Sequence, residues 1–416
     1  AHHPLNRPVF DAATATVKSG YGILQPRMDV SLTSALKTNF SWLMAGNAGS
    51  EPYVSGVSEV YQDIFGEGSF GGKGIYASKT FCDVIDGRFP ENAILSHDMI
   101  EGGYLKSGYV SDTVFTDDIP SNYISYRKRA HRWMRGDWQL LPYLMPVVRN
   151  SEGKRVSDNL DGITKYKIYE NLQRTLYEPI LCILAVLGIF FREIFTAALV
   201  LYAIRTVLPL LFEVISVLRI KITQNENKRI NKETFYRAAF NTLLIADSAF
   251  NNADAVIRTL SRLKSKTKLL EWQTAMQAEG ANKKGVGYYF RVMLYSAVFG
   301  GVLFIAALAL SHMALAFTGA VFVSAPAAAY ALGKNRKQKE ITLSAEEEDI
   351  IDFTAKGAWN YFKEFCTEQT NYLPPDNFQE EPYKGAVMRT SPTNIGMMLC
   401  GCVAAEILGY INVKDA

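Results

Sequence analysis

The sequence predicts a mixed α/β portion over residues 1–170, four membrane-crossing helices, and the start of an all-α region over residues 341–416. Of the 416 residues, 48% are hydrophobic and 20% are charged, which is too apolar for a disordered chain and high for an ordinary soluble enzyme. Short apolar runs broken by Gly, Pro and Asn fill the first part, whereas long apolar runs begin at about Leu172. The length is sufficient for two or three folding units.

Four apolar runs predict the membrane helices. They form two pairs, Leu176–Phe191 with Ile194–Leu218 and Tyr288–Leu310 with Ala314–Leu332. Each run approaches the ~20 residues that cross the hydrocarbon, and the short polar break inside each pair predicts a helical hairpin. The second pair is rich in Ala, Gly and Val, which suits close helix packing in lipid. For any single run, a buried core helix is the alternative.

Basic residues predict the orientation. Residues 221–284 carry 12 Lys plus Arg against 6 Asp plus Glu, and 334–339 is also basic, whereas the two hairpin turns carry little positive charge. By the positive-inside rule, all the polar parts lie in the cytoplasm. The predicted parts are the α/β portion 1–170, a first hairpin 172–219, a basic amphipathic loop 220–287, a second hairpin 288–332, and the final region 341–416.

The basic loop and the second apolar run each leave an alternative open. The apolar spacing in 220–287 is partly helical, which predicts a helix at the membrane surface or, nearly as well, a solvated helical hairpin. Arg205 and Glu213 lie about two turns apart in the second run and share a face, so a transport role is a minor possibility.

Charge, cysteines and the first residues exclude some classes of protein. A net charge of +3 gives no argument for nucleic acid binding. Five cysteines without CxxC pairs argue against a disulfide framework or a zinc site. The chain opens Ala-His-His-Pro without a signal peptide, so we expect it to be a piece of a longer polypeptide.

The first candidate site element is glycine-rich. Five glycines lie within 66–74, among them Gly71 and Gly72, and such a loop lets backbone N–H groups approach an anion. It matches neither a P-loop nor a dinucleotide fingerprint, and a tight structural loop is an equal alternative.

The second element is the sequence 96–102. Asp98 and Glu101 lie three apart on one predicted helical turn, after Ser96 as a possible N-cap. Helix capping is one interpretation. The other is that Asp98 is a general base, because inverting transfer to a sugar hydroxyl needs a carboxylate that accepts the proton.

The third element is a dense basic segment after an acidic-x-Pro sequence. Arg129, Arg132, Trp133, Trp138 and Gln139 follow Asp118-Ile-Pro in a stretch with five cations within nine positions. Such a cluster favours an anion such as a diphosphate, and tryptophan faces suit sugar rings. A basic juxtamembrane face for anionic lipid is the alternative.

These motifs resemble the acceptor-side half of processive family-2-type GT-A glycosyltransferases, such as cellulose and chitin synthases. Arg132-Trp133 matches the end of their Gln-x-x-Arg-Trp motif, with Arg129 in place of the glutamine, and Asp98 matches the aspartate of their Thr-Glu-Asp motif. The resemblance implies a partial GT-A fold with Asp98 as base. It also implies that Arg132 holds the nucleotide diphosphate and that Trp133 lines the acceptor site.

Longer motifs are similar to cyclic β-1,2-glucan synthases. They are His3-Pro-Leu-Asn-Arg-Pro8, Gly87-Arg-Phe-Pro-Glu-Asn92, the stretch from His131 to Gln139, and Leu373-Pro-Pro-Asp376 with Arg389-Thr-Ser-Pro-Thr-Asn394. The last two resemble the opening of that family's glucoamylase-like domain, which implies a truncated (α/α) barrel. No Asp-x-Asp occurs in the 416 residues, although GT-A enzymes of this kind hold Mg²⁺ or Mn²⁺ and UDP with one. We therefore expect the metal ligands to lie mostly outside this chain.

The resemblance implies a multi-pass protein of the bacterial cytoplasmic membrane that transfers glucose from UDP-glucose with inversion to a growing β-glucan. The expected partners are UDP-glucose, the glucan acceptor and the lipid bilayer. Two alternatives remain open at this stage. They are another processive polysaccharide synthase, because the motifs do not encode linkage, and a catalytically inactive membrane scaffold.

Overall fold

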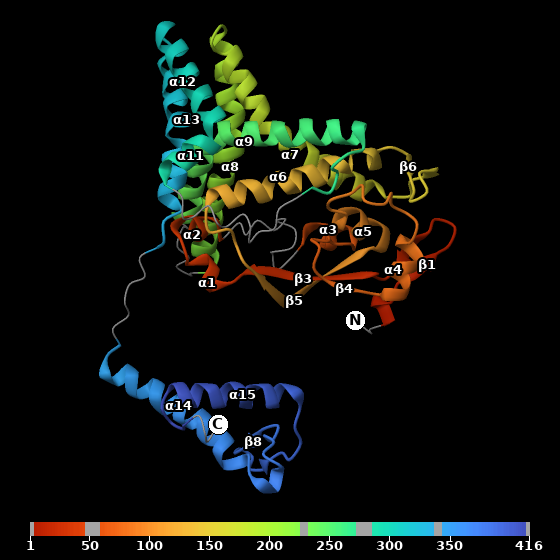
Figure 1. Cartoon of the computed structure of the whole chain (residues 1–416), viewed down its shortest axis with the longest axis vertical. Coiled ribbons are helices and arrows are strands. Elements are labelled where there is room, and N and C mark those ends of the chain that lie inside the picture. The colour runs from red at the N-terminus through yellow and green to blue at the C-terminus, as the bar shows by residue number, and fades with distance from the viewer. Residues whose placement is uncertain (1–3, 46–58, 225–231, 272–284, 337–342, 413–416) are drawn as a thin grey trace. The chain divides into compact units, whose positions relative to one another are not determined.

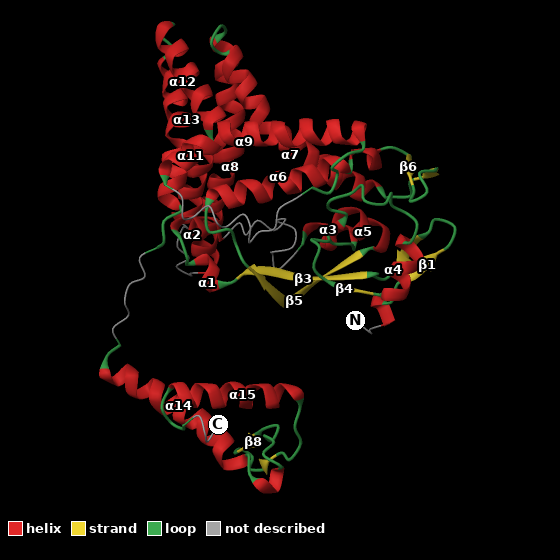
Figure 2. Cartoon of the chain, viewed as in Figure 1, coloured by secondary structure: helices red, strands yellow, loops and turns green. Residues whose placement is uncertain are grey.

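The computed structural model describes residues 4–45, 59–224, 232–271, 285–336 and 343–412. The chain forms two compact units, Ala1–Arg336 and Lys337–Ala416, and each is described by itself. Helices dominate, and the strands are confined to small sheets (Figure 2). The predicted combination of a sheet portion with apolar helices is confirmed at this level.

The central sheet of the first unit has three strands in the order β4-β3-β5. Strand β3 (Ile23–Val30) pairs in parallel with β5 (Ser107–Asp117) and antiparallel with the short β4 (Ile75–Tyr76). Ile23 and Gln25 on β3 are fully buried. Because β3 and β5 run in parallel, their carboxyl ends meet at one edge, where open α/β sheets place ligands.

Short elements surround this sheet. The strand pairs are β1 (Val9–Asp11) with β2 (Thr16–Ser19) and β6 (Val147–Arg149) with β7 (Arg155–Ser157). The short helices are η1 (Pro4–Asn6), α1 (Leu32–Ala35), α2 (Asn39–Ala45), α3 (Val60–Phe65), α4 (Ser78–Ile85), α5 (Asp98–Leu105) and η3 (Leu141–Leu144).

Two long helices lie one on the other between the sheet and the apolar helices. Helix α6 (Tyr123–Gln139) begins at Asn122, whose side-chain oxygen accepts a hydrogen bond from the Ser125 amide at 2.9 Å. Helix α9 (Lys232–Ser265) is continuous over 34 residues and packs on α6 and α7 (Figure 1). The basic loop therefore contains a long helix. Its buried face, which includes Phe240 and Leu244, contacts protein.

The apolar helices correct the expectation of four crossings. They are α7 (Gly162–Leu187), α8 (Arg192–Gln224), α11 (Val286–Val292), α12 (Leu294–Ala309) and α13 (Met313–Leu332). Among the described residues, only Arg192–Arg219 within α8 and α13 are long and apolar enough to cross a membrane. A third candidate appears if α11 and α12, which bend by 79°, form one span.

Helix α7 is the predicted crossing that does not qualify. It starts fourteen residues before the predicted run, at the Asp161 N-cap, and its first half packs with α5 and α6. Lys167, near that end, is almost fully buried in the protein. The helix is therefore anchored in the polar part, and only its last turns, which pair with α8, are apolar.

Helices α12 and α13 pack closely as a hairpin and run side by side in Figure 1. An alanine Cβ at Gly300 would lie 2.8 Å from the Gly319 carbonyl oxygen and 2.9 Å from the Cβ of Phe322. At the adjacent Gly301, no atom lies within 4 Å of the added Cβ. The small residues thus allow the close backbone approach that the sequence predicted.

This pair of glycines gives a matched test of the hairpin. We expect Gly300→Ala to lower the thermal unfolding temperature of the detergent-solubilised protein, because overpacking costs about 1–3 kcal/mol. Gly301→Ala should leave it unchanged or raise it slightly, because alanine favours the helix by about 1 kcal/mol. Equal unfolding temperatures for the two variants would contradict the hairpin packing.

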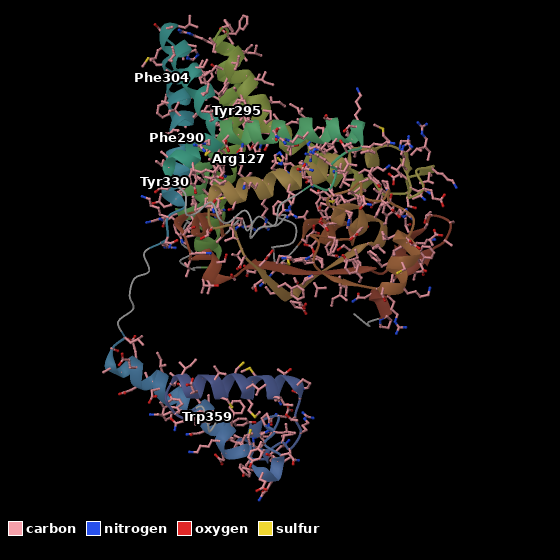
Figure 3. The ribbon with its side chains drawn as sticks, viewed as in Figure 1. Arg127, Phe290, Tyr295, Phe304, Tyr330 and Trp359 are labelled. Atoms are coloured by element: carbon pink, nitrogen blue, oxygen red, sulfur yellow. The ribbon has the colours of Figure 1, made fainter. Side chains whose placement is uncertain are left out.

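The second unit contains two helices that pack together, α14 (Ala345–Phe365) and α15 (Pro392–Ile407). A capping box starts α14, in which Ser344 and Glu347 exchange hydrogen bonds. The helical start predicted for 341–416 is therefore present, and Trp359 lies on α14 (Figure 3). The remaining elements are η5 (Glu368–Thr370), β8 (Phe378–Gln379) and β9 (Gly385–Ala386).

Candidate active site

Asp98 occupies the first turn of α5 and lines a cavity in the first unit. The Ser96 hydroxyl donates a hydrogen bond to its Oδ2 at 2.8 Å. Burial raises the pKa of Asp98 above its ordinary value, and the nearby Glu101 raises it further. The Ser96 hydrogen bond and the charges of His97 and Arg132 act in the opposite direction. A carboxylate whose pKa is raised is a stronger proton acceptor than an ordinary one.

The glycine-rich loop packs directly against this carboxylate. Gly72 has φ +84°, and a Cβ added there would lie 2.9 Å from Oδ1 of Asp98. The amide of Gly71 donates to the side-chain oxygen of Gln25 on β3 at 2.8 Å. The loop is thus fixed to the sheet, and Gly72 leaves room for Asp98.

The carboxyl ends of β3 and β5 form the floor of the cavity. Asp117 ends β5 and pairs with Lys73 from the glycine-rich loop. Burial acts to raise the pKa of Asp117, but Lys73, the Asp118 amide and Arg129 outweigh it and lower the pKa. Asp118 accepts a hydrogen bond at 2.7 Å from Ser31, which directly follows β3. The acidic-x-Pro sequence therefore links the two parallel strands.

Helix α6 contributes the cationic wall. The guanidinium of Arg129 lies 4.5 Å above the centre of the Trp133 ring, as in a cation–π pair. Arg132 interacts electrostatically with Asp98. Burial lowers the pKa of both Arg129 and Arg132. An arginine guanidinium nevertheless stays protonated in proteins. Both residues carry their charge at neutral pH.

The cavity has a volume of about 2020 Å³ and brings together Gly71, Gly72, Asp98, Arg132 and Trp133 from separate parts of the sequence. Arg129 lines it as well. Among the described residues, nine lysine and arginine side chains and six carboxylates line this cavity, so its walls carry net positive charge. An anionic ligand such as a nucleoside diphosphate suits such walls.

Three of the predicted site residues do not line this cavity. Glu101 is buried and pairs through Oε1 with Nδ1 of His97 at 2.7 Å. The indole of Trp138 is buried and donates to Thr175 Oγ1 at 2.8 Å. These two side chains therefore contact other parts of the protein and lie outside the cavity lining.

Gln139 has the same kind of role. Its side-chain oxygen accepts a hydrogen bond from the Leu95 amide at 2.6 Å, and its nitrogen donates to the Leu269 carbonyl at 3.0 Å. It joins the segment before Asp98 to the segment after α9.

Sequence reasoning missed the contribution of α9 to the cavity. Asp254 on α9 accepts hydrogen bonds from His131 on α6 at 2.9 Å and from Arg258 at 2.7 Å. Arg258 and Arg262 line the cavity with these residues. From the sequence, only the basic character of 220–287 was apparent, and it predicted either a helix at the membrane surface or a solvated helical hairpin.

One group of side chains offers atoms for a metal ion. His97, Asp98 and Glu101 present possible ligand atoms that lie within 4.8 Å of one another. The pair between His97 and Glu101 would have to break first, because it already engages Nδ1 and Oε1. Among the described residues, this group is therefore a poor fit to a permanent divalent cation, and Asp98 remains available as a base.

Comparison with known proteins relates the whole chain to one curated protein. No family model matches the chain. Over an alignment of 434 positions that covers the whole chain, it is 35% identical to the cyclic β-(1,2)-glucan synthase NdvB of Rhizobium meliloti (strain 1021). The chain spans 15% of the length of this relative. The resemblance inferred from the motifs is confirmed at the level of sequence relationship.

Proposed function

Because the whole chain is related to part of a cyclic glucan synthase, we propose that it belongs to a membrane glucosyltransferase that builds β-1,2-glucan, with the ring closed elsewhere in the protein. The donor is UDP-glucose, and the anomeric configuration inverts. The observation that supports this most directly is the position of Asp98 and Arg132 in one basic cavity, with the backbone of Gly72 against the carboxylate.

The proposed step is a direct displacement. The 2-hydroxyl oxygen of the acceptor attacks the anomeric carbon of the donor glucose, and the bond from this carbon to the diphosphate oxygen breaks. The hydroxyl proton passes to Asp98, and UDP leaves with the electron pair of the broken bond. Arg132 and Arg129 offset the charge of the leaving diphosphate through charge-assisted hydrogen bonds. Trp133 supplies an aromatic face for the acceptor sugar.

The cofactor of this reaction is proposed to be Mg²⁺ or Mn²⁺, which would neutralise charge on the diphosphate when bound. Its ligands are proposed to lie mostly in parts of the protein beyond this chain, because the carboxylates near Asp98 are already engaged. The protein is further proposed to span the bacterial cytoplasmic membrane several times, with the cavity on the cytoplasmic side, where UDP-glucose is made.

Incorporation of radiolabelled glucose tests the proposal. Membranes that contain the complete protein are incubated with labelled UDP-glucose, and methylation analysis determines the linkage of the product. A 1,2-linked product is expected. A different linkage would favour another processive synthase, and absence of incorporation by the wild type would favour an inactive scaffold.

The Ser96 hydrogen bond predicts a shift in the pH dependence. This bond lowers the pKa of Asp98, so Ser96→Ala raises that pKa further. Since the base acts only when ionised, the acid limb of the profile of kcat/KM against pH moves to higher pH. The expected shift is roughly one pH unit, given the usual strength of a hydrogen bond to a charged group.

The control for this shift is Ser78→Ala, at an exposed serine that begins α4. It should leave the acid limb in place. If the acid limb of Ser96→Ala lay at the wild-type pH or at lower pH, Asp98 would not control the profile of kcat/KM against pH.

A further inference from the structure

A buried carboxylate on α9 lies at the junction of three helices and is not part of the proposed reaction. Asp247 has 1% of its surface exposed. An ionised carboxylate in such a place is very unfavourable unless hydrogen bonds and an opposite charge compensate it. The hydrogen-bond partners of Asp247 therefore indicate its role.

Two strong hydrogen bonds reach Asp247 from α6. The hydroxyl of Tyr123 donates to Oδ2 at 2.7 Å, and Nε of Arg127 donates to the same oxygen at 2.8 Å. The Arg127 side chain is 20% exposed, and Arg127 lines the candidate active site. It lies where the apolar helices meet α6 and α9 (Figure 3). Asp247 thus holds Nε of the Arg127 guanidinium in place. The other nitrogens of this guanidinium are further hydrogen-bond donors on a residue that lines the cavity.

The other oxygen of Asp247 faces the beginning of α12. Ser296 Oγ, in the first turn of α12, lies 3.5 Å from Oδ1 and donates more closely to the Met293 carbonyl at 2.8 Å. Met293 is the N-cap of α12 and provides no side-chain cap. A carboxylate near this end is favourable because helix N-termini carry partial positive charge. The bend of 79° between α11 and α12 lies at this residue.

We propose that Asp247 is a positioning residue for the glucosyltransferase reaction. It orients Arg127 toward the donor diphosphate from a position beside the start of the apolar helix α12. The inference rests on the proposed function, because it assigns Arg127 to the donor. Removing the charge of Asp247 therefore weakens donor binding, while the bond-making step at Asp98 is left intact.

A double-mutant cycle tests this proposal in membranes that contain the complete protein. Asp247→Asn and Arg127→Lys should each raise the KM for UDP-glucose by about tenfold, because each removes a hydrogen bond to a charged group. The kcat should change by less than about threefold in both. The double variant should resemble each single variant, because both substitutions remove the same interaction.

Two variants separate positioning from a merely structural role. Tyr123→Phe removes a different bond to the same carboxylate, and Ser296→Ala removes the long contact to α12. Both are expected to lower the unfolding temperature or leave it unchanged, with a KM within about twofold of wild type.

The inference is overturned if Asp247→Asn lowers only the unfolding temperature, or if the effects of the two substitutions on KM add. If the asparagine variant does not accumulate, Asp247→Glu displaces the charge by one methylene and gives the same test, and a wild-type KM there overturns the inference. No incorporation by the wild-type protein would instead refute the proposed function, and the inference with it.

Discussion

Asp98→Asn is expected to reduce glucose incorporation from UDP-glucose by about 10²–10⁴-fold, the range typical of a lost general base. The asparagine has the same shape, so it keeps the contacts with Ser96 and Gly72. It cannot take up the proton of the 2-hydroxyl group of the acceptor sugar. The loss should appear in kcat, because the donor still meets the cations of α6. Steady-state kinetics in membranes measure both parameters.

A matched control is Asp112→Asn, at an exposed carboxylate on the same strand that ends at Asp117. It should retain wild-type kcat. Glu101→Gln is a second comparison, because Glu101 pairs with His97 but does not itself line the cavity. If Glu101→Gln lost as much activity as Asp98→Asn, or if Asp98→Asn retained wild-type kcat, the assignment of the base would be wrong.

Gly72→Ala is expected to reduce kcat by at least about tenfold. Its φ of +84° is unfavourable for a residue with a side chain, which costs about 1–2 kcal/mol. In addition, the new methyl group would lie 2.9 Å from Oδ1 of Asp98 and displace the carboxylate. Small displacements of catalytic groups cost large factors in rate. Kinetics with UDP-glucose, together with thermal unfolding, distinguish this effect from instability.

Gly66 in the same loop supplies the control. It also has a positive φ, +71°, but an added Cβ would have no atom within 4 Å. Gly66→Ala should therefore lower the unfolding temperature by a similar amount and retain kcat. Equal losses of kcat in both variants would show that loop strain is the cause, and the contact with Asp98 would then be unimportant.

The candidate site was predictable where its residues lie close together in the sequence. Asp98 follows a short apolar run, and Arg132 with Trp133 forms a compact motif on one turn of α6. These features follow from residue type and helical spacing alone. Trp138 and Gln139 belong to the same motif but lie outside the cavity lining, and only the packed structure shows that they contact Thr175 and Leu95.

The number of membrane crossings shows a limit of composition. Apolar runs show which part of a helix can lie in lipid or in a protein core, but they do not show at which residue the helix begins. Helix α7 begins at Gly162 and is held in the polar part by its first turns. Arg205 shows the same limit. Helical spacing placed it on one face with Glu213, whose side chain lies outside the described residues, and the structure places it 3.5 Å from Glu178 on α7.

The sequence by itself determined the α/β portion, the apolar hairpins and the relationship to a cyclic glucan synthase, and it indicated Asp98 as the candidate base. Those properties depend on periodicity, composition and contiguous motifs. The tertiary structure decided which of the cations surround Asp98, that Gly72 touches it, and that Asp247 on α9 joins Arg127 on α6 to α12. These contacts join segments up to about 170 residues apart, and packing of complete helices brings such segments together whereas local patterns cannot.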